Sequence, residues 1–544
     1  MHHPDTGFVR TLRPALTAAL VATLTSGISG TALAHSPEVS APAGVISGLS
    51  QENGDTFLGI PYAVPPVGPL RWQSAIPAPA ASHPISAITQ HEGCAALISG
   101  DAFETHNENC LYLNVYRPRM SAPHARLPVV VFIHGGANQA GTPAIYDGAA
   151  FAQTTHSIVV IPAYRLGIFG FLAISGEQKS RNPDGDLAAG DIVAALRWVH
   201  TNIGAFGGNP ENVTLAGESA GAANVCDLLT APASSGLFSQ AIMESGFCPA
   251  RPSLAVMQAA GAGAAKEAGC TGPYPFACLR SKPVKTLLES WNTVWTRPLL
   301  RLENGQEVPR PLFPMTPSGS SLQPVSPEVA IRSGAWHHVP VLVGFNRDEL
   351  RSFLAGYYPL SPETYATILD RAYPEIKKDL TALYPLKNDA SPVYTLAAIR
   401  TDQLFICPAL RAASALSSST TVSVYEFADR TAPPFHSLAM KLPAPEGFDR
   451  GASHTAELPY LFGYKSVIGP LSAEQTELSR KMMAMWQAFG QPDSGWSRWT
   501  QENPVVTVIA DNRSGGIQNR NDIAGLHHCD FWANHPQLPN TLFP

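Results

Sequence analysis

Continuous apolar runs alternate with helical segments in the first half of the chain. The helical segment 186–206 repeats its apolar residues every three or four positions, as an amphipathic helix does. The apolar runs are 127–136 (LPVVVFIHGG), 157–164 and 238–245. Such runs separated by helices are typical of a mostly parallel sheet that is buried on both faces. The pattern therefore predicts an α/β fold, with later strands at 339–345, 421–427 and 505–510.

Length and composition fit one large domain. Of the 544 residues, 45% are hydrophobic and 14% are charged, whereas a typical soluble domain carries roughly 25% charged residues. The Pro- and Gly-rich stretch from about Pro249 to Pro327 has the character of an insertion over the sheet. The net charge of −6 includes no block of like charge, so we expect no nucleic-acid partner. We expect residues 35–544 to form a single α/β domain.

Residues 1–34 have the pattern of a secretory signal peptide. Arg10 and Arg13 precede an uncharged apolar stretch at 15–30, and the small residues of Ala32-Leu33-Ala34 form a cleavage site. The alternative is a membrane anchor, but this stretch is shorter than the ~20 residues a span needs. We therefore expect removal of residues 1–34, no membrane span, and a secreted or periplasmic protein. Eight cysteines suit that oxidising environment, although they allow 105 pairings.

The segment Gly217-Glu218-Ser219-Ala220-Gly221 is the only G-x-S-x-G in the chain. An apolar run precedes it and a helix-forming run follows it. That setting favours a nucleophilic serine on a sharp strand-to-helix turn, rather than a glycine-rich turn alone. A serine also needs a base, and the base needs an acid to orient it. After the predicted strand 339–345, Asp348 and Glu349 are both candidates for the acid, and His454 is the candidate base downstream.

Backbone N–H groups are needed to bind the negative charge that develops on the substrate. One should come from Ala220, and others from the turn at 133–138, which follows an early strand.

Four separated motifs resemble those of the type-B carboxylesterases, a family that includes the cholinesterases. They are FLGIPYAVPPVGPLRW (57–72), ENCLYLNVYRP (108–118), NPENVTLAGESAGAANV (209–225) and MWQAFGQPDSGWSRW (485–499). The resemblance spans nearly the whole chain after residue 34. It implies an α/β-hydrolase fold with insertions over the active site.

The resemblance also implies roles for individual residues. It selects Glu349 over Asp348, which gives a Ser219–Glu349–His454 triad, and it makes Gly136, Ala137 and Ala220 the donors to the oxyanion. Glu218 and Ser245 match positions that support this site, although Glu218 is equally well explained as a carboxylate at a helix start. The family's disulfides correspond to Cys94–Cys110, Cys270–Cys278 and Cys407–Cys529. The remaining Cys226 and Cys248 are either a fourth bridge or two buried thiols, and export favours the bridge.

Two departures from the family bear on the substrate. Ala137 and Asn138 replace a glycine and an aromatic residue, so we do not expect activity on bulky tertiary-alcohol esters. The segment between Cys94 and Cys110 contains no tryptophan of the kind that holds quaternary ammonium groups, which disfavours choline esters.

The sequence thus predicts an exported serine carboxylesterase that acts on small-molecule esters without a metal or cofactor. The pairs His337-His338 and His527-His528 are interpreted as structural or surface residues rather than metal ligands, because neighbouring residues on a strand point to opposite faces. A specialist esterase for a natural product, toxin or polyester is an alternative. A non-catalytic binding protein is the alternative from another class. The sequence does not indicate an oligomeric state.

Overall fold

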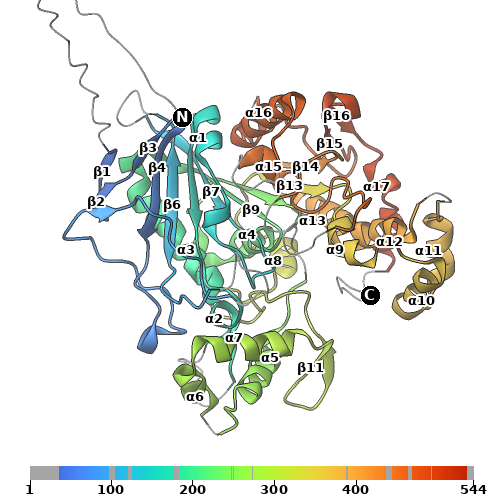
Figure 1. Ribbon diagram of the computed structural model, residues 1–544, viewed down its shortest axis with the longest axis horizontal. Helices are drawn as coiled ribbons and strands as arrows, with labels where there is room; N and C mark the ends of the chain where they lie inside the picture. The colour runs from blue at the N-terminus through green and yellow to red at the C-terminus, as the bar shows by residue number, and fades with distance from the viewer. Residues whose placement is uncertain are drawn as a thin grey trace, which may run out of the picture. The chain divides into compact units, whose positions relative to one another are not determined.

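The centre of the structure is an eleven-stranded sheet. The computed structural model describes residues 36–96, 105–119, 125–175, 183–246, 248, 250–272, 274–387, 390–435, 444–462, 469–491 and 493–535, so the predicted signal peptide lies outside the described residues. The strand order is β16-β15-β14-β13-β10-β9-β7-β8-β6-β4-β3, with β3 and β16 at opposite edges (Figure 1). Along this order, every neighbouring pair from β15 to β8 is parallel. The pairs nearer the two edges, which are β16–β15, β8–β6, β6–β4 and β4–β3, are antiparallel.

The strand bounds confirm the predicted α/β architecture. All six apolar runs predicted as strands contain one. The strands of the sheet are β3 Leu49–Gln51, β4 Gly54–Pro61, β6 Tyr112–Arg117, β7 Leu127–Ile133, β8 Ile158–Pro162, β9 Gly208–Glu218, β10 Gln240–Glu244, β13 Val341–Asn346, β14 Val422–Phe427, β15 Val506–Ile509 and β16 Ile517–Arg520. A small separate sheet holds β1 Glu38–Ala41, β2 Gly44–Ser47 and β5 Ile85–Ser86.

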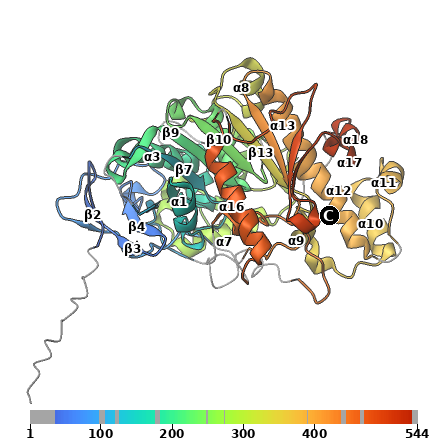
Figure 2. The same ribbon diagram turned by 90° about the horizontal axis from the view of Figure 1, so that it is seen from above.

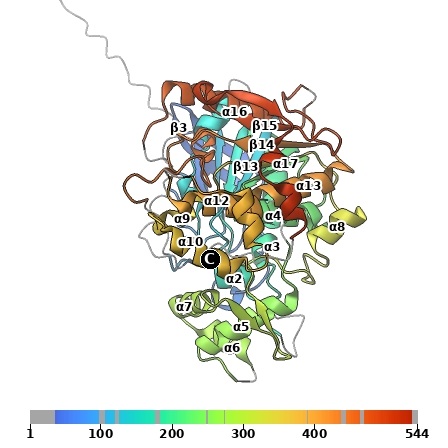
Figure 3. The same cartoon turned by 90° about the vertical axis from the view of Figure 1, so that its right-hand side faces the viewer.

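Helices cover both faces of the sheet. Strand β7 shows why its sequence is apolar throughout: Val129 and Val131 belong to one hydrophobic core, while Val130 and Phe132 belong to another on the opposite face. One face is covered by α1 Ala149–Thr155, α15 Leu458–Leu461 and α16 Ala473–Ala488. The other is covered by α2 Gly167–Phe171, α3 Leu187–Asn202, α4 Ala220–Thr230, α8 Pro327–Ser333 and α13 Cys407–Ser417. Figure 3 shows β13 to β15 between α16 and α13.

Two groups of helices extend beyond these layers. The predicted insertion contains α5 Leu254–Glu267, α6 Pro275–Ser281, α7 Val284–Trp295 and the hairpin of β11 Leu299–Arg301 and β12 Glu307–Pro309. A second group follows β13, and the sequence did not reveal it. It comprises α9 Arg351–Leu354, α10 Pro362–Ala372, α11 Lys377–Leu383 and α12 Pro392–Thr401, packs around a core of its own, and lies at the opposite end from β2 and β3 (Figure 2).

Four disulfides connect the cysteines of the chain. They are Cys94–Cys110, Cys226–Cys248, Cys270–Cys278 and Cys407–Cys529. The second ties the helix α4 to the segment after β10. The fourth ties α13 to α18 Cys529–Ala533, which follows the short helix α17 Ile523–Leu526. Residues from Ser36 onward form one compact unit. In the described ranges, no helix has the length and apolar character needed to cross a membrane.

Candidate active site

Ser219 lies on a strained turn between β9 and α4. Its backbone has φ of 56° and ψ of −122°, a region that residues with side chains rarely adopt. The Ser219 N–H donates a 2.8 Å hydrogen bond to the carbonyl of Glu244, which continues the pairing of β9 with β10 one residue past the end of β9. The strain is thus held by hydrogen bonding to a neighbouring strand, and the serine side chain is left partly exposed.

The two glycines of the motif are required by close backbone contacts. A side-chain carbon at Gly217 would lie 2.7 Å from the backbone of Gly221, and one at Gly221 would lie 2.1 Å from the carbonyl oxygen of Ile133. Both distances are shorter than atoms can tolerate, so α4 can pack against β9 and β7 only if these positions are glycine. The spacing of the motif therefore has a direct steric cause.

The loop after β7 presents backbone N–H groups beside the serine. Gly136, Ala137 and Asn138 have φ of 114°, 55° and 54°, and a run of left-handed residues gathers successive N–H groups in one concave turn. In the described part of the chain, no backbone hydrogen bond uses the N–H of Gly136 or Ala137. A side-chain carbon at Gly135 would lie 3.1 Å from Cβ of Ser219, so the loop lies directly against the serine. Ala220 opens α4, where N–H groups have no partner within the helix.

Asn138 fixes this loop, a role that the sequence did not reveal. Its side chain exchanges hydrogen bonds with that of Asn224 on α4, at 2.9 and 3.2 Å, and also donates to the carbonyl of Pro314 at 2.8 Å. Tyr164 donates to the carbonyl of His134 at 2.7 Å. Asn138 is fully buried. Asparagine tolerates the left-handed conformation better than most residues, so it both adopts the turn and ties it to α4.

His454 and Glu349 form a short hydrogen bond. The Nδ1 atom of His454 lies 2.6 Å from Oε2 of Glu349, and the His454 N–H donates to the Glu349 carbonyl at 3.2 Å. Asp348, the other candidate acid, points elsewhere: it accepts from Ala452 N–H and pairs with Arg351 and Arg430. Of the two neighbouring acids, the structure therefore places only Glu349 against the imidazole.

The other edge of the imidazole faces the residue before the serine. Nε2 of His454 lies 3.1 Å from Oε1 of Glu218, and the rings of Phe353 and Phe405 flank the imidazole, each with its centroid at 5.3 Å. Among the described residues, no hydrogen bond joins Ser219 Oγ to His454. Hydrogen bonds between a nucleophile and its base are often long before substrate binds and tighten in the complex.

A network of buried polar groups supports the acid and the base. Asn346 donates its backbone N–H to Glu349 at 2.8 Å, and its side chain donates to Glu457 and to the Ser453 carbonyl. Ser245, with φ of 47°, donates to Glu457 at 3.5 Å. Sequence reasoning identified Ser245 but missed Asn346 and Glu457. The sequence signal for Glu457 was its position three residues after His454, within the same turn of the chain.

The clustered charges shift the pKa values of these groups. Burial by itself lowers the pKa of His454, but the carboxylates of Glu218 and Glu349 outweigh burial and raise it above the ordinary value of 6.5. Burial raises the pKa of Glu218, and it raises that of Glu457 to about 7, with repulsion from Glu349 adding to the rise. The site therefore favours the charged imidazolium and holds protons on some of its carboxyl groups near neutral pH.

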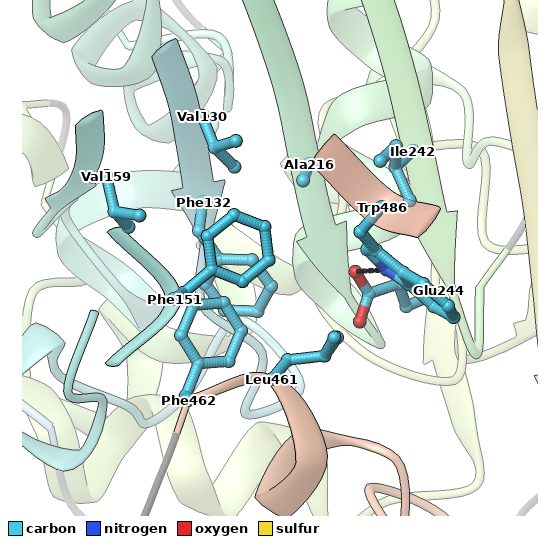
Figure 4. A pocket seen from close by; sticks show the side chains of 10 residues that line it. All are labelled: Val130, Phe132, Phe151, Val159, Ala216, Ile242, Glu244, Leu461, Phe462 and Trp486. Carbon is cyan, nitrogen blue, oxygen red and sulfur yellow. Dashed lines mark hydrogen bonds between the residues drawn. The ribbon is translucent and has the colours of Figure 1, made fainter. Parts of the chain in front are cut away.

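A small cavity lies between the sheet and the helices α1, α15 and α16 (Figure 4). It has room for about one water molecule, and Glu244 is the one acidic side chain among the ten that line it. Oε1 of Glu244 accepts a 2.9 Å hydrogen bond from the indole N–H of Trp486. Burial raises the pKa of Glu244 well above that of an ordinary carboxyl. This residue therefore supports the serine through its carbonyl and carries a neutral side chain.

The two histidine pairs lie outside the strands, so the geometric reason given for their interpretation was wrong. His337 and His338 lie between α8 and β13, while His527 and His528 lie between α17 and α18. His527 is nevertheless structural, because it lies 2.6 Å from Asp402 and 3.3 Å from Glu426 in a buried ion cluster. Within the described ranges, no group of three or more potential ligands has the arrangement of a metal site.

Comparisons with known proteins agree along nearly the whole chain. Residues 35–532 match the family model described as "Carboxylesterase family". The chain is 32% identical to carboxylesterase 1D of Mus musculus, over 88% of each chain, and 32% identical to the para-nitrobenzyl esterase of Bacillus subtilis (strain 168), over 86% of this chain and 94% of that one. A solved structure of a PNB esterase superposes with a TM-score of 0.70 at 29% identity, covering 90% of this chain and 98% of the other.

Proposed function

Because this chain belongs to the carboxylesterase family and is a carboxylic ester hydrolase with the fold of the PNB esterases, we propose that Ser219, His454 and Glu349 are its catalytic triad. The observation that carries the proposal is the joint placement of three parts. A strained serine lies against a loop of left-handed residues, and a buried histidine that contacts the residue before this serine is held by a carboxylate at 2.6 Å.

The reaction follows from these positions. His454 takes the proton from Ser219 Oγ as that oxygen attacks the ester carbonyl. The N–H groups of Gly136, Ala137 and Ala220 donate to the oxyanion, an interaction worth roughly 3 kcal/mol for each donor in comparable sites. His454 then gives its proton to the leaving alcohol, and a covalent acyl-serine remains.

Water completes the cycle by the same steps. His454 removes a proton from the water as it attacks the acyl-serine, and then returns the proton to Ser219 as the acid leaves. Glu349 keeps Nδ1 protonated and stabilises the imidazolium that forms in both halves of the reaction. Glu218 faces the other edge of the ring and adds to this stabilisation.

The first test compares Ser219→Ala with Ser239→Ala on p-nitrophenyl acetate. Ser239 immediately precedes β10, at the end of that strand far from the turn, so its variant controls for the loss of a hydroxyl. We expect the first variant to lose at least 1000-fold in kcat, and the second to keep wild-type activity. A fluorophosphonate should label wild type at Ser219. Hydrolysis of the acetate at the wild-type rate by Ser219→Ala contradicts the triad, and labelling of the wild type at a residue other than Ser219 contradicts a nucleophilic Ser219.

We also propose that residues 1–34 direct export and are removed. Four disulfides within residues 94–529 support an oxidising destination, because such bonds rarely persist in a reducing cytosol. Expression in the native host followed by N-terminal sequencing of the exported protein should give a chain that starts at His35. Recovery of the full-length chain from the cytosol contradicts this proposal.

A further inference from the structure

A buried ion cluster links the C-terminal helices α17 and α18 to the segments that carry the proposed catalytic acid and base. Its centre is His527, which lies between these two helices. Nδ1 of His527 lies 2.6 Å from Oδ1 of Asp402, and Nε2 lies 3.3 Å from Oε1 of Glu426. Both carboxylates are buried. Burial lowers the pKa of His527, but these carboxylates outweigh burial and raise it to about 10. The ring is therefore charged at neutral pH and donates through both nitrogens.

The first carboxylate of the cluster belongs to a turn that reaches the proposed base. Asp402 begins the π-helical turn Asp402–Ile406, which joins α12 to α13. Turns of this kind are frequent at functional sites. Three residues after Asp402, the ring of Phe405 flanks the imidazole of His454, with the two centroids 5.3 Å apart. One end of the turn is thus held by the ion cluster, while a side chain near its other end packs against the base.

The loop that carries Glu349 is joined to the cluster on both sides of this acid. Before it, Arg347 donates two hydrogen bonds to Glu426, at 2.8 and 3.1 Å. After it, the N–H of Leu350 donates a 3.0 Å hydrogen bond to Oγ1 of Thr401, the last residue of α12. The acid and the base are therefore both connected to the point where α12 meets the π-helical turn.

The C-terminal helices are tied to this turn by further bonds. Cys529, the first residue of α18, forms a disulfide with Cys407, the first residue after the turn. The indole N–H of Trp532 on α18 donates at 2.9 Å to the hydroxyl of Tyr384, and that hydroxyl donates to Asp402 at 2.8 Å. Figure 2 shows α17 and α18 beside α12. A change in these helices must therefore be felt by the turn.

We propose that His527 is a positioning residue for the reaction. Its hydrogen bond to Asp402 fixes the turn beside the proposed base. Its hydrogen bond to Glu426 fixes Arg347, and with it the loop that carries the proposed acid. The inference rests on the proposed function, because these positions matter for catalysis only if His454 and Glu349 are the base and the acid. A remote substitution that displaces reacting groups by about 1 Å can lower the rate roughly 100-fold.

The test compares His527→Gln with Asp55→Asn on p-nitrophenyl acetate, well below the melting temperature of each protein. Active sites are counted by reaction to completion with a fluorophosphonate. Asp55→Asn is the matched control, because it removes one partner of a 2.9 Å ion pair with Arg117 that joins β4 to β6, near the β3 edge of the sheet. We expect His527→Gln to lower kcat per active site by about 5- to 50-fold with KM changed less than about twofold. The control should keep the wild-type kcat.

The pH profile separates positioning from a loss of stability alone. Burial lowers the pKa of His454, but the carboxylates of Glu218 and Glu349 raise it, so a looser contact with Glu349 should lower it. We expect the acid limb of kcat/KM in His527→Gln to move toward acid by about half a pH unit. A lower kcat or a shifted limb that Asp55→Asn does not share supports the proposal. A lower melting temperature with neither change overturns it, as does the same change in both variants.

Thr401→Val replaces His527→Gln if the latter does not fold. It removes the hydroxyl that accepts from Leu350 and keeps the branched side chain, and it should lower kcat about threefold or more with little change in KM. A wild-type kcat in Thr401→Val then overturns the proposal. Failure of the proposed function is distinguishable, because then Ser219→Ala keeps its activity. If this inference alone fails, Ser219→Ala is inactive and His527→Gln works at the wild-type rate.

Discussion

The Nε2 atom of His454 lies 3.1 Å from Oε1 of Glu218, the residue that directly precedes Ser219. The edge of the imidazole that must accept the serine proton is therefore in contact with a buried carboxyl group. With Glu349 on the opposite edge, the ring lies between two acids, and the protonated form of the base is stabilised before any substrate binds.

Replacing Glu218 should move the pH dependence of catalysis toward acid. The neutral form of His454 is the active base, so activity falls as the pH drops through the raised pKa of this histidine. Glu218→Gln removes one of the charges that raise this pKa, and we expect the acid limb of kcat/KM to shift down by about one pH unit. Glu211→Gln, an exposed position at the start of the same strand, should leave the limb in place. An unchanged limb in Glu218→Gln shows that this carboxyl does not control the base.

The side chain of Glu244 should be replaceable by its neutral isostere. Its pKa is raised by burial, so ionisation becomes a cost to the folded state once the pH exceeds the unfolded value near 4.5. The wild type should therefore lose up to about 1.4 kcal/mol of stability for each pH unit above that value, until the pKa in the folded state is reached. Glu244→Gln should be as stable as wild type at pH 4.5 and increasingly more stable at pH 6, 7 and 8. Parallel stability profiles for the two proteins, measured by urea unfolding, contradict a neutral Glu244.

The hydrogen bonds between Asn138 and Asn224 should matter for rate as well as stability. Alanine has a higher helix propensity than asparagine, so Asn224→Ala should not disfavour helix α4 itself. It removes the hydrogen bonds to the buried Asn138 side chain, which is left with fewer partners. We expect a loss of about 1–3 kcal/mol in unfolding free energy and roughly a tenfold lower kcat, with KM little changed, because the oxyanion donors lose their fixed position. The double-mutant cycle with Asn138→Ala should show strong coupling in both quantities. Additive effects in the cycle contradict a shared role.

His527 should stabilise the fold most at acidic and neutral pH. Burial lowers its pKa, but Asp402 and Glu426 outweigh burial and raise it to about 10. Because the folded pKa is above the unfolded 6.5, this stabilisation is fully present below pH 6.5 and is lost as the pH rises through about 10. The difference in stability between wild type and His527→Gln should therefore be large at pH 6 and shrink by roughly 1.4 kcal/mol per pH unit above 6.5. His528→Gln is the neighbouring control, and a pH-independent difference for His527→Gln rules out a charged histidine.

Sequence reasoning predicted the parallel strands because each is buried on both faces and is therefore apolar at every position. It also predicted the turn at Ser219, since the steric demands on Gly217 and Gly221 are local. It could not separate Asp348 from Glu349 on residue chemistry alone, because adjacent side chains differ only in the direction they point. The contact of Glu218 with His454 joins residues far apart in the sequence, and the helices 362–401 pack on one another rather than on the sheet. Neither produces a periodic pattern that a sequence can display.

The anchoring of Ser219 has a consequence for how this protein can diversify. The serine turn is fastened by the carbonyl of Glu244 and by the contact of Gly221 with Ile133, so its supports come from the sheet itself. Helices α5 to α7 and the hairpin after them contribute none of these supports. The supports of the turn and the insertion are thus separate parts of one chain, so mutations in the insertion should leave the position of the serine undisturbed. Libraries that vary residues 254–309 should therefore keep the serine turn intact.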